Sequence, residues 1–285
     1  FLYEEEMIMK KLLSLSLAAA LAVSATACGN SGSGSSDGAD AEAPAAGTEG
    51  TEAEGTQTEG AEDAGTGSAA ADGSVFKIGA IGPTTGAASA YGTAVMNAAK
   101  IAVDEINAAG GINGYQVEFN PQDDEHDQEK SVNAYNTLKD WGMQLLLGTV
   151  TSAPCIAVEA EASADNMFLL TPSGSAIDCI SGENAFRVCF ADPDQGTASA
   201  QYIGENGLAE KVAVIYDSSD VYSSGIYETF VTEAANQPFE IVASEAFTAD
   251  SKTDFSVQLQ KAKDSGADLV FLPFYYNEAA LVFTQ

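Results

Sequence analysis

The segment from Val75 to Gly114 consists of a short apolar run followed by a stretch with the periodicity of an amphipathic helix. It constrains the fold more than any other stretch of the chain. Residues 75–81 are mostly apolar, as in a buried parallel strand, and Gly82-Pro83 ends the run. A helical face then follows up to Gly110-Gly111, made of Val95, Ala99, Ala102, Val103 and Ile106. A strand, a loop and a crossover helix predict an α/β fold whose ligand edge lies at the carboxyl ends of the strands.

The same alternation continues along the chain. We predict further strands at residues 115–120, 144–147, 167–170 and 186–190, with helices at 127–141 and 153–164 between them. A second series has helices at 195–206, 224–236 and 254–265, with strands at 212–216, 239–243 and 269–274. Strict alternation predicts parallel sheets with right-handed crossovers and helices on both faces. Two series that part near residues 192–201 predict two lobes with a cleft between them.

The N-terminal residues 1–28 have the pattern of an export signal behind an upstream extension. FLYEEE precedes Met7 and Met9, and Lys10-Lys11 then lead into twelve mostly apolar residues, 12–23. A transmembrane anchor is the alternative, but a span needs roughly 18 to 20 apolar residues. Small residues before Cys28 resemble the lipobox of bacterial lipoproteins, although Ala25 stands where that pattern has Leu. We therefore predict that Cys28 is acylated and anchors the protein to a membrane.

Residues 29–74 lack large apolar side chains and are predicted to be a disordered, acidic tether. The whole chain has a net charge of −31, and residues 74–285 alone contain 29 acids and 9 bases. Such a balance argues against nucleic acid or an anionic lipid surface as a partner. Cys155, Cys179 and Cys189 have no CxxC spacing, which argues against zinc. Two alternatives stay open for them, a Cys179–Cys189 disulfide across a turn or three buried free thiols.

Hydroxyl-rich loops follow the first-lobe strands, at residues 84–86, 149–152 and 171–175. Hydroxyls and free N–H groups at a helix N-terminus can hold a carboxylate without Arg or Lys. The second lobe supplies aromatic rings at the equivalent edge, Tyr222 and residues 274–276. Hydroxyls for a charged head and rings for an apolar body predict an amino acid ligand. Helix capping and turn formation are the alternative explanation for each single loop.

Several segments also carry a family resemblance, which covers residues 75–285 in order. They are IGPTTGAASAYGTAVMNAAKIAVDEINAAGGINGYQVEF, TPSGSA, FRVCFADPDQGTASAQYI, VAVIYDSSDVYSSG, FTADSKTDFS and PFYYNEAAL. Together they resemble the substrate-binding proteins of branched-chain amino acid ABC transporters, the leucine/isoleucine/valine-binding family of type I periplasmic binding proteins.

The resemblance implies a two-lobed clamshell with a first lobe at residues 75–195 and an incomplete second lobe at 196–285. It implies a monomer that carries a branched-chain or other apolar amino acid to permease subunits, at the outer face of the cytoplasmic membrane or in the periplasm. No cofactor or metal is expected. The ligand-binding residues that it implies are Tyr91, Ser152, Ser173, Ser175, Asp192, Tyr222 and Tyr275.

The chain departs from this family at two places. His126 and Thr151 stand where relatives with a first-lobe disulfide have cysteines. The family's acidic partner for the ligand ammonium lies on a strand beyond residue 285, so we expect part of the second lobe and the last helices of the first lobe to be absent.

Other functions are less well supported. An enzyme would need a nucleophile with a base, but the one histidine, His126, lies in an acidic run and is expected to be a solvated surface residue. Residues 75–285 contain no GxSxG nucleophile elbow, and the chain contains no GxxxxGK motif. Residues 123–127 could hold calcium or form a charged loop, and their spacing favours the loop. Amides, urea or aromatic acids remain alternative ligands, and a receptor's sensor domain remains an alternative context.

Overall fold

The computed structural model describes residues 74–285, which all belong to one compact unit. The predicted export signal, the acylated Cys28 and the tether lie outside the described residues. The predicted alternation of strands and helices is confirmed, and the observed strands are β1 (Val75–Gly82), β2 (Gln116–Asp123), β3 (Leu145–Leu147), β4 (Leu169–Thr171), β5 (Ala185–Arg187), β6 (Lys211–Asp217), β7 (Glu240–Phe247) and β8 (Leu269–Phe271).

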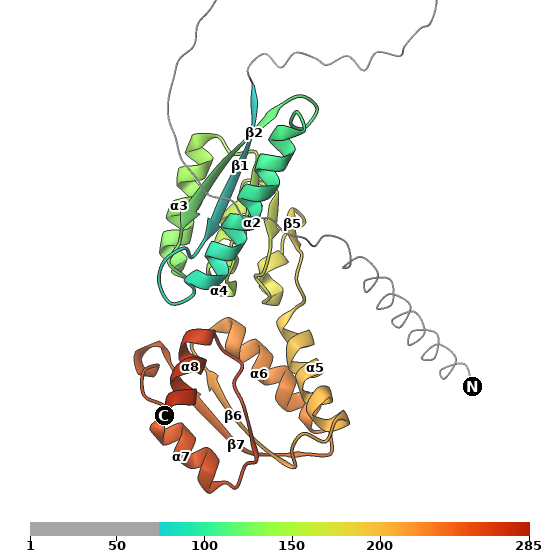
Figure 1. The fold of residues 1–285 in the computed structure, drawn as a ribbon, viewed down its shortest axis with the longest axis vertical. Helices are drawn as coiled ribbons and strands as arrows, with labels where there is room; N and C mark the ends of the chain where they lie inside the picture. The colour runs from blue at the N-terminus through green and yellow to red at the C-terminus, as the bar shows by residue number, and fades with distance from the viewer. Residues whose placement is uncertain (1–73) are drawn as a thin grey trace, which may run out of the picture. The chain divides into compact units, whose positions relative to one another are not determined.

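The first five strands form one parallel sheet in the order β2-β1-β3-β4-β5. Its crossovers are α2 (Ser89–Ala108), α3 (Gln128–Trp141) and α4 (Ser152–Ala164), followed by the short 3₁₀ helix η1 (Ile177–Ile180) (Figure 1). Tyr135 and Leu138 of α3 pack with Val158 of α4 against Leu146 and Leu169 of the sheet, and all five are fully buried. This core fixes the carboxyl ends of β1, β3 and β4 beside one another.

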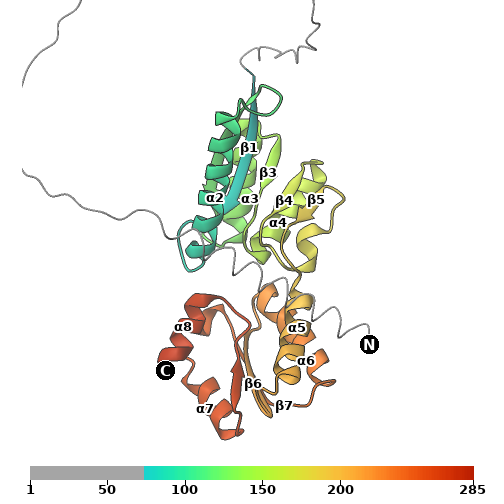
Figure 2. The ribbon, with the colours of Figure 1, turned by 45° about the vertical axis from the view of Figure 1, so that its right-hand side comes forward.

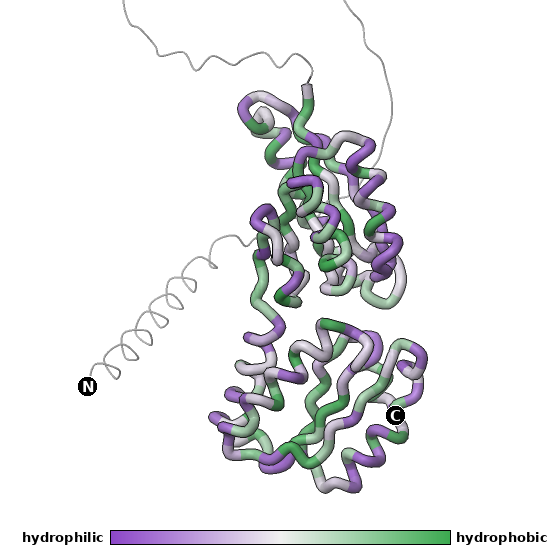
Figure 3. The backbone as a smooth tube through the Cα atoms, turned by 180° about the vertical axis from the view of Figure 1, so that it is seen from behind, coloured by the Kyte–Doolittle hydropathy of each residue, from purple (hydrophilic) through white to green (hydrophobic). Residues whose placement is uncertain are grey.

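The second sheet has the order β7-β6-β8 and is also parallel. Figures 1 and 2 show α5 (Asp192–Glu205) and α6 (Val221–Ala234) on one side of it, with α7 (Ser256–Asp264) and α8 (Tyr276–Thr284) on the other. Side chains of β6 alternate between the two sides, because Val212 and Val214 join the core under α5 and α6 while Ile215 joins that under α7 and α8. Figure 3 shows the hydrophobic stretches running along these strands.

Some predicted boundaries are wrong. Strand β5 ends at Arg187, and Val188 and Phe190 beyond it are exposed. Helix α5 begins at Asp192, three residues before the predicted start, because Pro193 is compatible with a first helical turn. Ala102, assigned to the buried face of α2, is exposed, and the buried residues of that helix are Gly92, Met96 and Val103. Helices η1, η2 (Ala249–Ser251) and α8 were not predicted.

The three described cysteines are free, and Cys189 is only half-buried. The Cys179–Cys189 disulfide is therefore not formed in this structure. No helix within residues 74–285 has the length and apolar character that crossing a membrane requires.

Candidate functional site

The hydroxyl-rich loops after β3 and β4 are tied to one another at the start of α4. Ser152 is the first residue of α4, and its Oγ accepts hydrogen bonds from the N–H groups of Ser175, at 3.3 Å, and Ala176, at 3.2 Å. Ser173 Oγ donates to the carbonyl of Val150 at 2.6 Å. These contacts bring backbone N–H groups and three serines together at a helix N-terminus, which is a favourable environment for an anion.

A cavity of about 180 Å³ opens at this point. Its volume lies below the range of roughly 300 to 1,000 Å³ that is usual for drug-sized ligands, so it suits a small metabolite. Its lining contains six of the seven predicted ligand-binding residues and five others, and consists of Tyr91, Val150, Thr151, Ser152, Ser173, Ser175, Cys189, Phe190, Gln195, Tyr222 and Tyr275.

The seventh predicted residue, Asp192, lies behind this lining. It is 2% exposed, its N–H donates to the carbonyl of Ser175 at 2.9 Å, and its Oδ1 accepts from Nε2 of Gln195 at 3.1 Å. Burial raises the pKa of Asp192 to about 6, against the lowering effects of the Ser175 hydroxyl, the Arg187 charge and Gln195. Asp192 therefore reaches the cavity through Ser175 and Gln195. Gln195 lines the cavity but was not predicted, because its only signal in the sequence is its place near a helix start.

Tyr275, the N-cap residue of α8, is the centre of an aromatic cluster. Its ring stacks on Tyr222 with centroids 4.8 Å apart, lies 5.9 Å from Tyr91, and meets the edge of His126 at 5.2 Å. The Tyr275 hydroxyl is buried and has no hydrogen-bond partner among the described residues. Asp220 fixes Tyr222 by accepting from its N–H at 3.0 Å, and burial raises the pKa of Asp220 to about 6. The rings of Tyr91, Tyr222 and Tyr275 thus line the same cavity as the serines, whereas Asp220 lines a second cavity.

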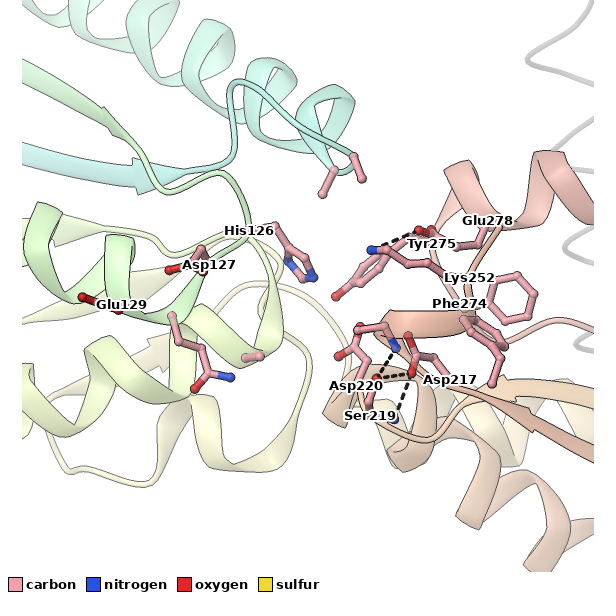
Figure 4. A pocket seen from close by; sticks show the side chains of 16 residues that line it. His126, Asp127, Glu129, Asp217, Ser219, Asp220, Lys252, Phe274, Tyr275 and Glu278 are labelled. Atoms are coloured by element: carbon pink, nitrogen blue, oxygen red, sulfur yellow. Dashed lines mark hydrogen bonds and ion pairs between the residues drawn. The ribbon is translucent and has the colours of Figure 1, made fainter. Parts of the chain in front are cut away.

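Tyr275 also borders a second, wider cavity of about 500 Å³ (Figure 4). Several charged side chains line it, and the labelled view shows His126 and Tyr275 pointing toward one another across it. Its acids are engaged locally: Asp217 Oδ1 accepts from the N–H of Ser219 at 2.8 Å, and Glu278 lies 3.5 Å from Lys252 Nζ. Acidic side chains therefore line this cavity, and several of them cap helices or make local contacts.

Within residues 74–285, no three His, Cys, Asp or Glu side chains are grouped so that they could hold a metal ion. Asp123 instead caps the loop that follows β1, where it accepts from the N–H of Thr84 at 2.9 Å and from the Thr85 hydroxyl at 2.6 Å. Burial opposes ionisation, but these hydrogen bonds prevail and lower the pKa of Asp123 to about 2. The interpretation as a charged loop agrees with this network.

The prediction that His126 is a solvated surface residue was wrong. The side chain is half-buried, and its Nδ1 lies 2.8 Å from Thr151 Oγ1, the residue just before α4. Burial lowers the pKa of His126, which favours the neutral ring. A hydrogen bond therefore joins the two positions at which related proteins were expected to have a disulfide. The acidic residues beside His126 in the sequence led to the prediction of a solvated side chain. Its burial depends instead on α4 and Tyr275, which are distant in the sequence.

Comparison with known proteins gives the same fold. The periplasmic binding protein family matches residues 75–285. The Leu/Ile/Val-binding protein homolog 3 of Brucella melitensis is 32% identical over 210 residues, which are 73% of this chain and 56% of that protein.

Two solved structures of similar proteins have the same fold. The branched-chain amino acid transporter substrate binding protein LivJ of Streptococcus pneumoniae, in complex with isoleucine, has a TM-score of 0.68 and 33% identity, over 73% of this chain and 60% of that one. The leucine binding protein LivK of Thermotoga maritima has a TM-score of 0.66 and 28% identity, over 73% and 59% of the two chains. The chain thus spans 56% to 60% of the length of these relatives. With its two parallel α/β sheets and its match over residues 75–285, the chain belongs to the periplasmic binding protein family.

Proposed function

We propose that this protein captures a branched-chain or other apolar amino acid and delivers it to the permease of an ABC transporter, without chemical conversion. The ligand binds between a first lobe, residues 75–195, and a second lobe, residues 196–285. The observation that carries the proposal is the cavity in which the serines at the start of α4 face Tyr222 and Tyr275. The names of the relatives, which are Leu/Ile/Val-binding and leucine-binding proteins, support the same class of ligand.

The ligand carboxylate binds at the N-terminus of α4. Ser152, Ser173 and Ser175 offer hydroxyl groups there, and the helix dipole favours negative charge. A basic side chain is not needed for this, since each hydrogen bond to a charged group contributes roughly 1.5 to 3 kcal/mol.

The ligand ammonium and side chain bind on the opposite wall. Asp192 and Asp220 are close enough to Tyr222 and Tyr275 to raise the pKa of both hydroxyls, after the larger effect of burial. These carboxylates give that wall a negative potential that favours a cation. The faces of Tyr91, Tyr222 and Tyr275 supply apolar surface for an aliphatic side chain.

The protein acts outside the cytoplasm, held to the membrane by acylated Cys28 and the acidic tether of residues 29–74. Attachment through lipid chains keeps the binding unit near its transporter while leaving it free to reach the permease. Amides, urea and aromatic acids are the alternative ligands, and the receptor sensor is the alternative context.

A ligand screen tests the proposal. Thermal unfolding of the purified protein is followed with leucine, isoleucine, valine, glutamine, urea or benzoate added in excess. Binding to the native state alone raises the melting temperature, so the aliphatic amino acids are expected to stabilise and urea and benzoate to have no such effect. Stabilisation by benzoate or glutamine without stabilisation by leucine would reject the ligand assignment.

A pair of variants then locates the site. Ser152→Ala is expected to weaken leucine binding about 10- to 100-fold, because it removes a hydroxyl next to the ligand carboxylate. Thr137→Ala is the control, since it removes an exposed hydroxyl on α3 that bonds only to the carbonyl of Asn133. Equal affinities for the two variants, with both folded by circular dichroism, would place the ligand elsewhere.

A further inference from the structure

Cys155 and Cys179 lie together in a small buried cluster beside the serine loops. Cys155 is in the first turns of α4 and Cys179 is in η1, and both are fully buried. They pack with Ala176, and the half-buried Ile156 and Val221 cover them. Neither thiol lines the proposed ligand cavity.

The two cysteine side chains are mutual neighbours. Cys155 Sγ lies 3.9 Å from the carbonyl of Cys179, and Cys179 Sγ lies 3.7 Å from the carbonyl of Ser152. Each thiol therefore contacts the backbone of the element that carries the other cysteine. The thiolate is the reactive form of a cysteine in disulfide exchange.

Cys189 is separate from this pair. It is half-buried, lines the ligand cavity, and its Sγ lies 3.9 Å from the carbonyl of Gly174. On the other side of the same loop, Gly174 packs against Cys155, since a Cβ there would come within 3.0 Å of Cys155 Sγ. Cys155 and Cys179 belong to one buried cluster, of which Cys189 is not a member.

We propose that Cys155 and Cys179 form a redox pair, which an oxidising disulfide such as oxidised glutathione closes into a disulfide that ties η1 to α4. The thiolate of one of the two cysteines attacks one sulfur of oxidised glutathione, forms a mixed disulfide and releases one glutathione thiolate. The other cysteine loses its proton and attacks the protein sulfur of the mixed disulfide, which releases a second glutathione thiolate. Two cysteine thiols are oxidised and one glutathione disulfide is reduced to two thiols.

The disulfide would close a loop that contains residues 171–175, the second serine segment of the ligand cavity. Restricting this loop in the unfolded chain stabilises the native state. Because both sulfurs are buried, the reaction proceeds during folding or through local opening. The inference holds whichever ligand the protein binds.

Mass spectrometry of the native sequence tests the pairing directly. The protein is refolded with oxidised glutathione, its free thiols are alkylated in denaturant, and its proteolytic peptides are mapped. The expected result is a cross-linked peptide that contains Cys155 and Cys179, which reduction separates, together with an alkylated Cys189. Alkylation of both Cys155 and Cys179, or a cross-link from either of them to Cys189, would overturn the proposal.

Melting temperatures of oxidised and reduced samples give the second readout. Oxidation is expected to raise the melting temperature by roughly 5 to 10 °C. Cys189→Ser should retain this difference, while Cys155→Ser and Cys179→Ser should lose it. A difference that survives in Cys155→Ser would contradict the pairing, and the comparison within each variant removes any effect of the substitution itself.

Discussion

Several residues that line the smaller cavity also make hydrogen bonds that hold its loops together, as Ser152 does. Six of the seven residues expected to bind ligand line one cavity, because each follows a strand of a parallel sheet or begins a helix after one. The positions of the Asp192 and His126 side chains could not be predicted from the sequence. Asp192 is displaced from the lining by Gln195 on the same helix turn. His126 is drawn inward by Thr151 and Tyr275, which are far from it in the sequence.

The titration of Asp192 gives a prediction at this scale. Its pKa of about 6 lies above the usual value near 3.9, so the native state keeps a proton that the unfolded chain releases between about pH 4 and pH 6. The contribution of Asp192 to the free energy of unfolding is therefore complete at the acidic end of this window and is lost as the pH rises through it. Asp192→Asn cannot titrate, and should remove that part of the pH dependence.

Urea unfolding at several pH values between about 4 and 7 measures this effect in the wild type and in Asp192→Asn. The difference in unfolding free energy between the two proteins should change across the window, in favour of the variant as the pH rises. A difference that stays constant with pH would show that Asp192 does not titrate in this way.

At the scale of elements, the sequence predicts the alternation of strands and helices well. Hydrophobic periodicity and glycine positions depend only on residues that are close together in the sequence. Every predicted strand and helix has an observed counterpart, but α8 was missed. Its N-cap residue Tyr275 and its first residue Tyr276 belong to an aromatic run, and these rings pack on Tyr91, which no local pattern reveals. The boundaries of β5 and α5 were misplaced because Pro193 is compatible with either a break or a helix start.

The packing of α5 on α6 gives a prediction at this scale. Gly196 lets the helices approach closely, since a Cβ there would lie 2.1 Å from Thr229 Oγ1 and 2.4 Å from the carbonyl of Ile226. Gly196→Ala should therefore destabilise the protein by about 1 to 3 kcal/mol. Gly225→Ala is the matched control in the same interface, because its Cβ would meet Asp192 Cβ at an ordinary 3.4 Å.

Denaturant unfolding of both variants checks this packing. Gly225→Ala should be neutral or slightly stabilising, because alanine is the better helix former by about 1 kcal/mol. If Gly196→Ala had the same free energy of unfolding as the wild type, α5 and α6 could move apart without destabilising the protein, and the prediction would be contradicted.

At the scale of the whole molecule, the charge of −31 implies strong self-repulsion. Added salt should therefore stabilise the folded state, because ions at about 0.15 M screen charges beyond roughly 8 Å. The melting temperature is expected to rise when sodium chloride is increased from about 0.01 M to about 0.15 M. A fall over this range would show that attractive surface ion pairs outweigh the repulsion.

The central claim is that hydroxyl and N–H groups at the start of α4 bind the carboxylate of an amino acid zwitterion. Calorimetric titration of the protein with L-leucine and with 3-methylbutylamine, which is leucine without its carboxylate, tests it most directly. Two or more hydrogen bonds to the carboxylate predict that leucine binds at least about 100-fold more tightly than the amine. Equal affinity for the two compounds, or binding of the amine alone, would contradict the claim.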